Sequence, residues 1–124
     1  MAEAEFTVHV LVRSLPEQTD PAQHLYGYAY TITIRNTGRV PAQLIAREWE
    51  ITDHHGQRQH VRGLGVVGHQ PMLQPGESFD YSSWAQIGTP QGSMQGRFFC
   101  ITHDAHWFET PVAEFALADS AHLH

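Results

Sequence analysis

Hydrophobic and polar residues alternate with a period of two along most of the chain, which is the period of a β-strand with one buried face. Residues 6–12 place Phe6 and three valines on one side, and residues 26–34 place three tyrosines and two isoleucines on one side. Both segments therefore predict strands with one face in the core. Further strands are predicted at 43–52, 57–62, around Phe79 and Tyr81, at 93–102 and at 107–117.

Three of these strands carry details of their own. In 43–52 the alternation puts Ile45, Trp49 and Ile51 toward the core, with Arg47 on the same side. In 107–117 the inward set changes phase just after Pro111, which indicates a β-bulge on an edge strand. In 93–102 the predicted inner face consists of Met94, Gly96, Phe98 and Cys100.

Glycine, proline and asparagine separate the strands about every 8–12 residues, and the chain shows no stretch of helical period. This pattern predicts an all-β fold, an immunoglobulin-like or fibronectin type III-like antiparallel β-sandwich of about seven strands. We expect a single domain over 1–124 with an ordered core at about 5–118. Residues 1–4 and Pro16–His24 lack alternation and are expected to be loose, and 119–124 is expected to be a flexible tail.

The charge balance narrows the possible partners. The chain has 124 residues with 13 acidic and 7 basic side chains, and every basic one is arginine, which gives a net charge of −6. Such a chain is a poor binder of the phosphate backbone, so we expect no nucleic-acid partner. Apolar runs are too short to cross a membrane, and the acidic amino terminus does not resemble a signal peptide, so a cytoplasmic location is expected.

Residues 63–68 form a G-x-G-x-x-G string with glycines at Gly63, Gly65 and Gly68. A dinucleotide fold needs a helix directly after this string, and prolines at 71 and 75 forbid one, so that interpretation is rejected. Two interpretations stay open. The backbone N–H groups form an anion-binding nest with Arg62 beside it, or the glycines only allow sharp bends, which is the commoner case.

Ten histidines suggest a metal site, with His103 and His106 flanking one turn as the candidate pair. No established metal-ligand spacing is present, so surface histidines are the favoured interpretation and no cofactor is predicted.

A set of catalytic residues is also lacking in the sequence. Glu48 and Glu50 are more typical of a solvated strand face than of an acid–base pair. The single cysteine, Cys100, lies among apolar residues, which favours a buried apolar side chain over a nucleophile. We therefore expect that this protein is not an enzyme.

Three tryptophans exceed what one thin core obviously needs. Trp49 is expected in the core. Trp84 stands at a strand end among polar residues, so it is the candidate for a surface anchor that binds a protein partner.

The middle of the chain resembles the ApaG family. The resemblance is carried by Arg47–Asp53, Val61–Pro71 and Leu73–Ser83, and it continues through Thr89-Pro90 and the glycines that follow. It implies a fibronectin type III-like sandwich, as the strand pattern does. It also implies a small binding domain, with a nucleotide pyrophosphate suggested for the glycine string, and for some members a link to cobalt and magnesium efflux.

Three functions follow as hypotheses. The first is a protein–protein interaction domain without enzymatic activity. The second is a binder of a nucleotide or diphosphate, in which Arg47, Arg62, Gly63, Gly65, Gly68 and His69 form the site. The third is a protein of divalent-cation homeostasis. A homodimer through an edge strand stays open.

Overall fold

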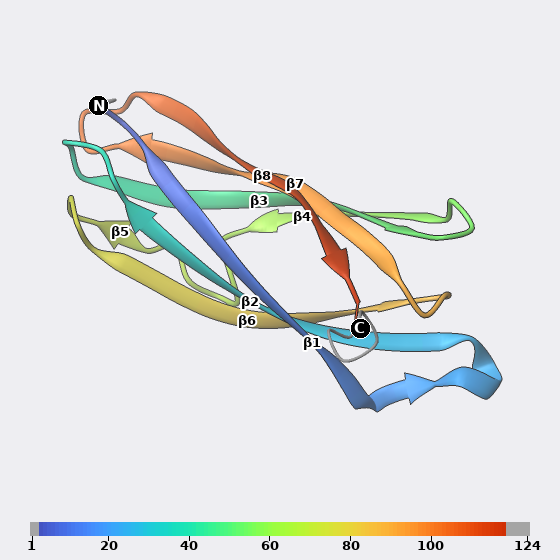
Figure 1. Ribbon diagram of the computed structural model, residues 1–124. Coiled ribbons are helices and arrows are strands. Elements are labelled where there is room, and N and C mark those ends of the chain that lie inside the picture. Colours follow the sequence, from blue (N-terminus) through green and yellow to red (C-terminus); the bar gives the residue numbers. More distant parts are fainter. Residues whose placement is uncertain (1–2, 119–124) are drawn as a thin grey trace.

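Residues 3–118, which the computed structural model describes, form two packed β-sheets (Figure 1). The smaller sheet has the strand order β1-β2-β6, and the larger has the order β4-β3-β7-β8 with the short β5 paired to β3. The strands are β1 (Phe6–Asp20), β2 (Leu25–Asn36), β3 (Ala42–Asp53), β4 (Arg58–Leu64), β5 (Met72–Leu73), β6 (Ser78–Ile87), β7 (Gly92–Thr102) and β8 (Trp107–Leu117), and a single 3-10 turn, η1, spans Pro21–Gln23. The predicted antiparallel sandwich is confirmed.

The core lies between the sheets and follows the predicted alternation. On β2 the inward residues are Tyr28, Tyr30, Ile32 and Ile34, all buried. The facing layer contributes Leu44, Trp49, Ile51, Met94, Phe98 and Cys100. Within the described residues, no helix is long and apolar enough to span a bilayer.

The prediction that Ile45 faces the core is wrong. The β3–β7 register runs from Leu44 opposite Cys100 directly to Ala46 opposite Phe99, so Ile45 is the extra residue of a β-bulge. Leu44 is fully buried in its place. A bulge changes the phase of the inward set by one residue, and the strand pattern alone does not locate it.

The phase change predicted in the last strand is confirmed. The β7–β8 register passes from Met94 opposite Phe115 to Gly96 opposite Val112, which is a bulge, and β8 is an edge of the larger sheet.

The prediction that Pro16–His24 is loose is wrong, because β1 continues to Asp20 and η1 follows it. Thr19 stabilises this segment: its hydroxyl donates to the carbonyl of Leu15 at 2.8 Å and accepts from the N–H of Gly27 at 3.0 Å. The predicted flexible tail, 119–124, lies outside the described residues.

The chain after β4 lies over the open side of the sandwich between the edge strands β4 and β6. The N–H of Gly65 donates to the carbonyl of Ile45 at 2.7 Å, and Val66 is fully buried in the core. The bulge at Ile45 thus provides the acceptor that holds this loop against the sheet.

Candidate functional site

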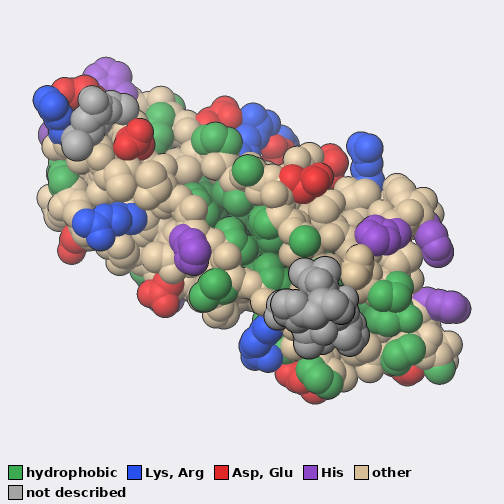
Figure 2. All heavy atoms as spheres, in the orientation of Figure 1, with side chains coloured by type: hydrophobic (Ala, Val, Ile, Leu, Met, Phe, Trp, Pro, Cys, Tyr) green, Lys and Arg blue, Asp and Glu red, His purple; other side chains and the backbone are tan. Residues whose placement is uncertain are grey.

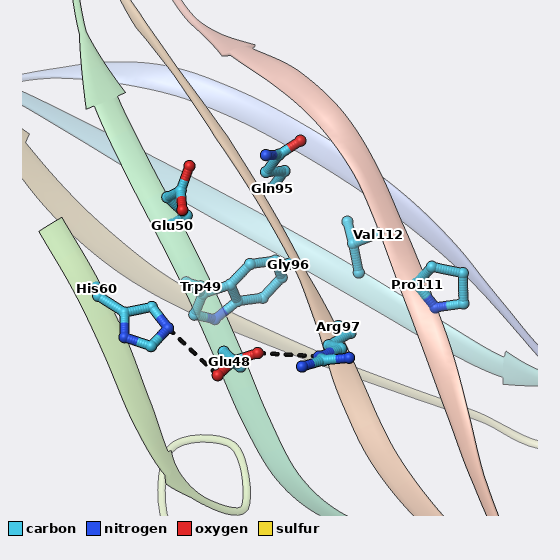
Figure 3. A pocket seen from close by; sticks show the side chains of 9 residues that line it. All are labelled: Glu48, Trp49, Glu50, His60, Gln95, Gly96, Arg97, Pro111 and Val112. Carbon is cyan, nitrogen blue, oxygen red and sulfur yellow. Dashed lines mark hydrogen bonds and ion pairs between the residues drawn. The ribbon is translucent and has the colours of Figure 1, made fainter. Parts of the chain in front are cut away.

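The outer face of the larger sheet carries a shallow pocket of about 380 Å³ (Figure 3). Glu48 and Glu50 flank Trp49 on β3, so their carboxylates lie on the solvent side while the indole enters the core. The pairing of strands then brings His60 from β4 and Arg97 from β7 beside them. The residues of this pocket therefore come from strands that are distant in the sequence.

Glu48 is the centre of an ion cluster on this face. Its Oε2 lies 2.6 Å from Nη2 of Arg62 and 3.2 Å from Nε2 of His60, and its Oε1 accepts from Nε of Arg97 at 2.9 Å. Arg97 continues to Glu109 at 2.9 Å. The cluster joins all four strands of the β4-β3-β7-β8 path into one network of charges.

This environment fixes the ionisation of Glu48. Hydrogen bonds from Arg62 and then from Arg97 hold the pKa of the Glu48 carboxyl below its usual value. A general acid at neutral pH requires the opposite shift. Cys100 is equally unsuited to catalysis, because burial raises the pKa of its thiol to about 12 and keeps it protonated.

Next to the ion cluster lies a row of apolar side chains, which we call the apolar strip: Ala46, Leu64, Phe99, Ile101 and Trp107. Ala46 pairs with both Leu64 and Phe99, and Ile101 pairs with Trp107, so the strip crosses four strands. Leu64 is 75% exposed and Trp107 is 66% exposed. Two shallow hollows meet at Phe99, one reaching Leu64 and the other Trp107.

The Gly63–Gly68 string forms a closed loop. The amide of Gly65 is bonded to Ile45, and the amides of Val66 and His69 are each bonded to the other's carbonyl, at 2.8 and 3.0 Å. These three N–H groups are therefore already used. Gly65 adopts φ +66°, and a Cβ there would meet the carbonyl oxygen of His69 at 2.5 Å, so glycine is required by the backbone itself.

Three of the predicted ligand residues, Arg47, Arg62 and Gly63, line one shallow hollow together with Leu64 and Phe99, and His69 does not line it. Arg47 pairs with Gly63 and lies on the inner side, whereas Arg62 pairs with Glu48 and lies on the outer side of the sheet. His69 is exposed, and its ring packs against Phe79 at a centroid distance of 5.5 Å. Both arginine side chains thus reach the hollow at Gly63, while the amides of Gly65, Val66 and His69 have partners within the protein.

Trp84 on β6 is 52% exposed, as a surface anchor requires. It pairs with Ala29 in the smaller sheet and lines a cavity at the edge of that sheet. Its contact with a partner stays a prediction.

Figure 2 shows histidines toward both ends of the face that it presents. Nδ1 of His106 lies 3.3 Å from Oδ2 of Asp104, and His103 is exposed in the same turn. Across residues 3–118, no three or more histidine, cysteine or acidic side chains are grouped so that they could hold a metal ion. The proposed His103–His106 pair thus has no third ligand among them.

Sequence reasoning missed the apolar strip. The alternation in 93–102 does put Phe99 outward, but Leu64, Ala46 and Trp107 become its neighbours only through strand pairing. The sequence did contain one sign of this strip, because several residues at the outward positions of these strands are apolar.

Comparisons with known proteins give a consistent result. A model of the ApaG domain family matches residues 16–102. Protein ApaG of Ralstonia nicotianae is 59% identical over 124 residues, covering all of both chains, and Protein ApaG of Bordetella pertussis is 51% identical over 120 residues, covering 97% of this chain and 92% of the relative. A crystal structure of a Bordetella pertussis protein named ApaA superposes with a TM-score of 0.92 at 50% identity, covering 96% of this chain and 97% of that one.

Proposed function

The chain belongs to the ApaG domain family, and we propose that it is a non-enzymatic protein-binding domain whose docking surface is the apolar strip. The observation that carries this proposal is the exposure of Leu64 and Trp107 at the two ends of one continuous row. Exposed apolar rows on a sheet face are typical of interaction sites, where aromatic residues supply most of the binding energy.

The charges beside the strip specify the partner. Arg62 and Arg97 are 68% and 42% exposed, whereas Glu48 between them is only 13% exposed. The two arginines thus cover Glu48, while Glu109 at the β8 end of the cluster is 53% exposed, in a chain whose net charge is −6. A segment that carries apolar anchors beside acidic side chains complements this surface.

The alternative of a pyrophosphate site at Gly63–Gly68 finds less support. A phosphate group is held by amides that have no other acceptor. Here the amides of Gly65, Val66 and His69 are bonded within the protein, and Arg62 is bonded to Glu48.

Affinity capture from cell extract, followed by cross-linking, tests the docking surface. We expect a Leu64→Ser and Trp107→Ser double variant to lose the proteins that the unaltered chain captures, and higher salt to weaken their capture. The matched control is Leu11→Ser, which changes a side chain of 62% exposure on the smaller sheet.

Capture of the same proteins by the double variant would overturn this docking surface. Trp84→Ala separates the two candidate surfaces. If this variant loses the partners while the double variant keeps them, the protein-binding function stands and its site moves to β6.

A further inference from the structure

The two edges of the larger sheet carry complementary side chains on its outer face. At the β4 edge, Leu64 and Arg62 are both exposed, and at the β8 edge, Trp107 and Glu109 are both exposed. Each edge therefore offers one apolar side chain and one charge, and the two charges have opposite signs. The β8 edge is itself a segment with an apolar anchor beside an acidic side chain, which matches the partner chemistry proposed for the docking surface.

Strand pairing orders these side chains into rows across the sheet. One row consists of Leu64, Ala46, Phe99 and Glu109, and the adjacent row consists of Arg62, Glu48, Arg97 and Pro111. Arg62 and Glu109 lie three strands apart, which is about 14 Å at the usual spacing of strands. Within one copy, Arg62 is bonded to Glu48 and Glu109 to Arg97. The two edge charges therefore do not contact each other in a single chain.

A two-fold axis brings them together between two copies of the chain. If the axis runs parallel to the strands and lies in the plane between the two faces, β4 of one copy lies over β8 of the other, and every contact occurs twice. Trp107 of one copy then lies next to Leu64 of the other, and Glu109 lies next to Arg62. The shallow hollow of about 280 Å³ that Leu64 and Arg62 line receives the incoming indole.

We propose that the apolar strip binds the apolar strip of a second copy, so that the protein forms a face-to-face homodimer. This inference rests on the protein-binding function proposed above, because it uses the same docking surface and names its partner. The strip and the arginines beside it cover about 20 Å in each direction, which is less than the area of about 800 Å² per partner in a standard interface. We therefore expect a weak dimer, with a dissociation constant on the order of 100 μM.

Mixing two variants of reversed charge tests the pairing of Arg62 with Glu109. In a homodimer of Arg62→Glu two carboxylates meet at each contact, and in a homodimer of Glu109→Arg two guanidinium groups meet there. Each variant alone should therefore have a dissociation constant at least about tenfold higher than wild type. An equimolar mixture should match wild type within about threefold, because the heterodimer has a pair of opposite charges at both contacts. Rearrangement within one copy cannot produce this rescue, since each copy keeps its own substitution.

Sedimentation equilibrium up to about 1 mM protein measures these constants. Salt of about 150 mM screens the net charge of −6 on each copy beyond about 8 Å and acts less on side chains in contact. The matched control is Glu17→Arg, which makes the same change of charge at an exposed residue of β1 in the smaller sheet. A mixture of Glu17→Arg with Arg62→Glu should show no rescue.

A wild type that stays monomeric at about 1 mM, or a mixture that associates no more tightly than its components, would overturn the homodimer. Thermal melting checks that each variant is folded. If Arg62→Glu does not fold, the Leu64→Ser and Trp107→Ser double variant replaces it, and a dimer that this variant retains would contradict the inference. The affinity capture described above is read separately. If the wild type is monomeric but the double variant still loses its captured partners, the docking surface stands and only the homodimer is wrong.

Discussion

The indole of Trp49 lies directly over Gly96 on the neighbouring strand. The two residues are paired across β3 and β7, and a Cβ at position 96 would meet the carbonyl oxygen of Glu48 at 1.9 Å and Cε3 of Trp49 at 2.7 Å. Trp49 in turn contacts Phe98 and Phe115 edge to face. The missing side chain at Gly96 therefore leaves the space that the Trp49 ring, the largest fully buried side chain of the described residues, occupies.

Gly96→Ala should consequently destabilise the fold by about 3 kcal/mol, because both the Glu48 backbone and the Trp49 ring must move. Chemical denaturation measures this change. Gly56→Ala is the comparison: Gly56 has φ +82° but open space around it, so its backbone strain alone should cost about 1 kcal/mol. Equal losses in the two variants would contradict the close packing of Trp49 on Gly96.

Glu48→Gln should make the thermal stability of the protein less dependent on pH in the acidic range. The pKa of Glu48 is lowered in the folded state from the value of 4.5, so its ion pairs stabilise the protein above pH 4.5 and are lost as the pH falls through the lowered pKa. Thermal melting from pH 7 to pH 3 checks this. The difference in Tm between wild type and variant should be largest at neutral pH and should shrink as the pH falls below 4.5.

Glu114→Gln is the control for that measurement, since Glu114 is exposed on β8. It should leave the profile unchanged. A constant difference between Glu48→Gln and wild type at every pH would show that the ion cluster does not contribute through the charge of Glu48.

Cys100 should be inert to thiol reagents in the folded protein. Its side chain is fully buried, and burial raises the pKa of the thiol to about 12, so the reactive thiolate is scarce at neutral pH. Labelling with a disulfide reagent at pH 8 should proceed only after denaturant is added. Rapid labelling under native conditions would contradict this burial.

Asn36 should tolerate neither alanine nor aspartate. It is 1% exposed, and its Nδ2 donates to the carbonyls of Val40 and Leu73, both at 2.9 Å, while its Oδ1 accepts from Gly38. Asn36→Ala should cost about 2 kcal/mol, because the buried carbonyl of Leu73 and the partly buried carbonyl of Val40 lose their donor. Asn36→Asp should cost more, since a carboxylate would face those same carbonyls.

Urea denaturation at pH 7 measures the stabilities of the wild type, Asn36→Ala and Asn36→Asp, which should decrease in that order. A milder effect of aspartate than of alanine would mean that water reaches this side chain. The matched control is Thr37→Ala, which changes the neighbouring residue of the same turn without touching the Val40 and Leu73 carbonyls.

The amino-acid sequence by itself determined the strands and most of the core. Period-two alternation identifies the buried faces of β2 and β7, because a strand places successive side chains on opposite sides whatever it pairs with. It also located the bulge in β8, since there the inward apolar residues themselves change phase. The burial of Trp49 and Cys100 followed from the same local pattern.

The tertiary structure determined the features that depend on which strands pair and in which register. The bulge at Ile45 buries Leu44 instead, and the hairpin register makes Arg62 a partner of Glu48 in the ion cluster. The apolar strip arises from strands brought together by hydrogen bonding and core packing. These contacts depend on register and on distant segments, and a periodicity, which is local, carries no information about either.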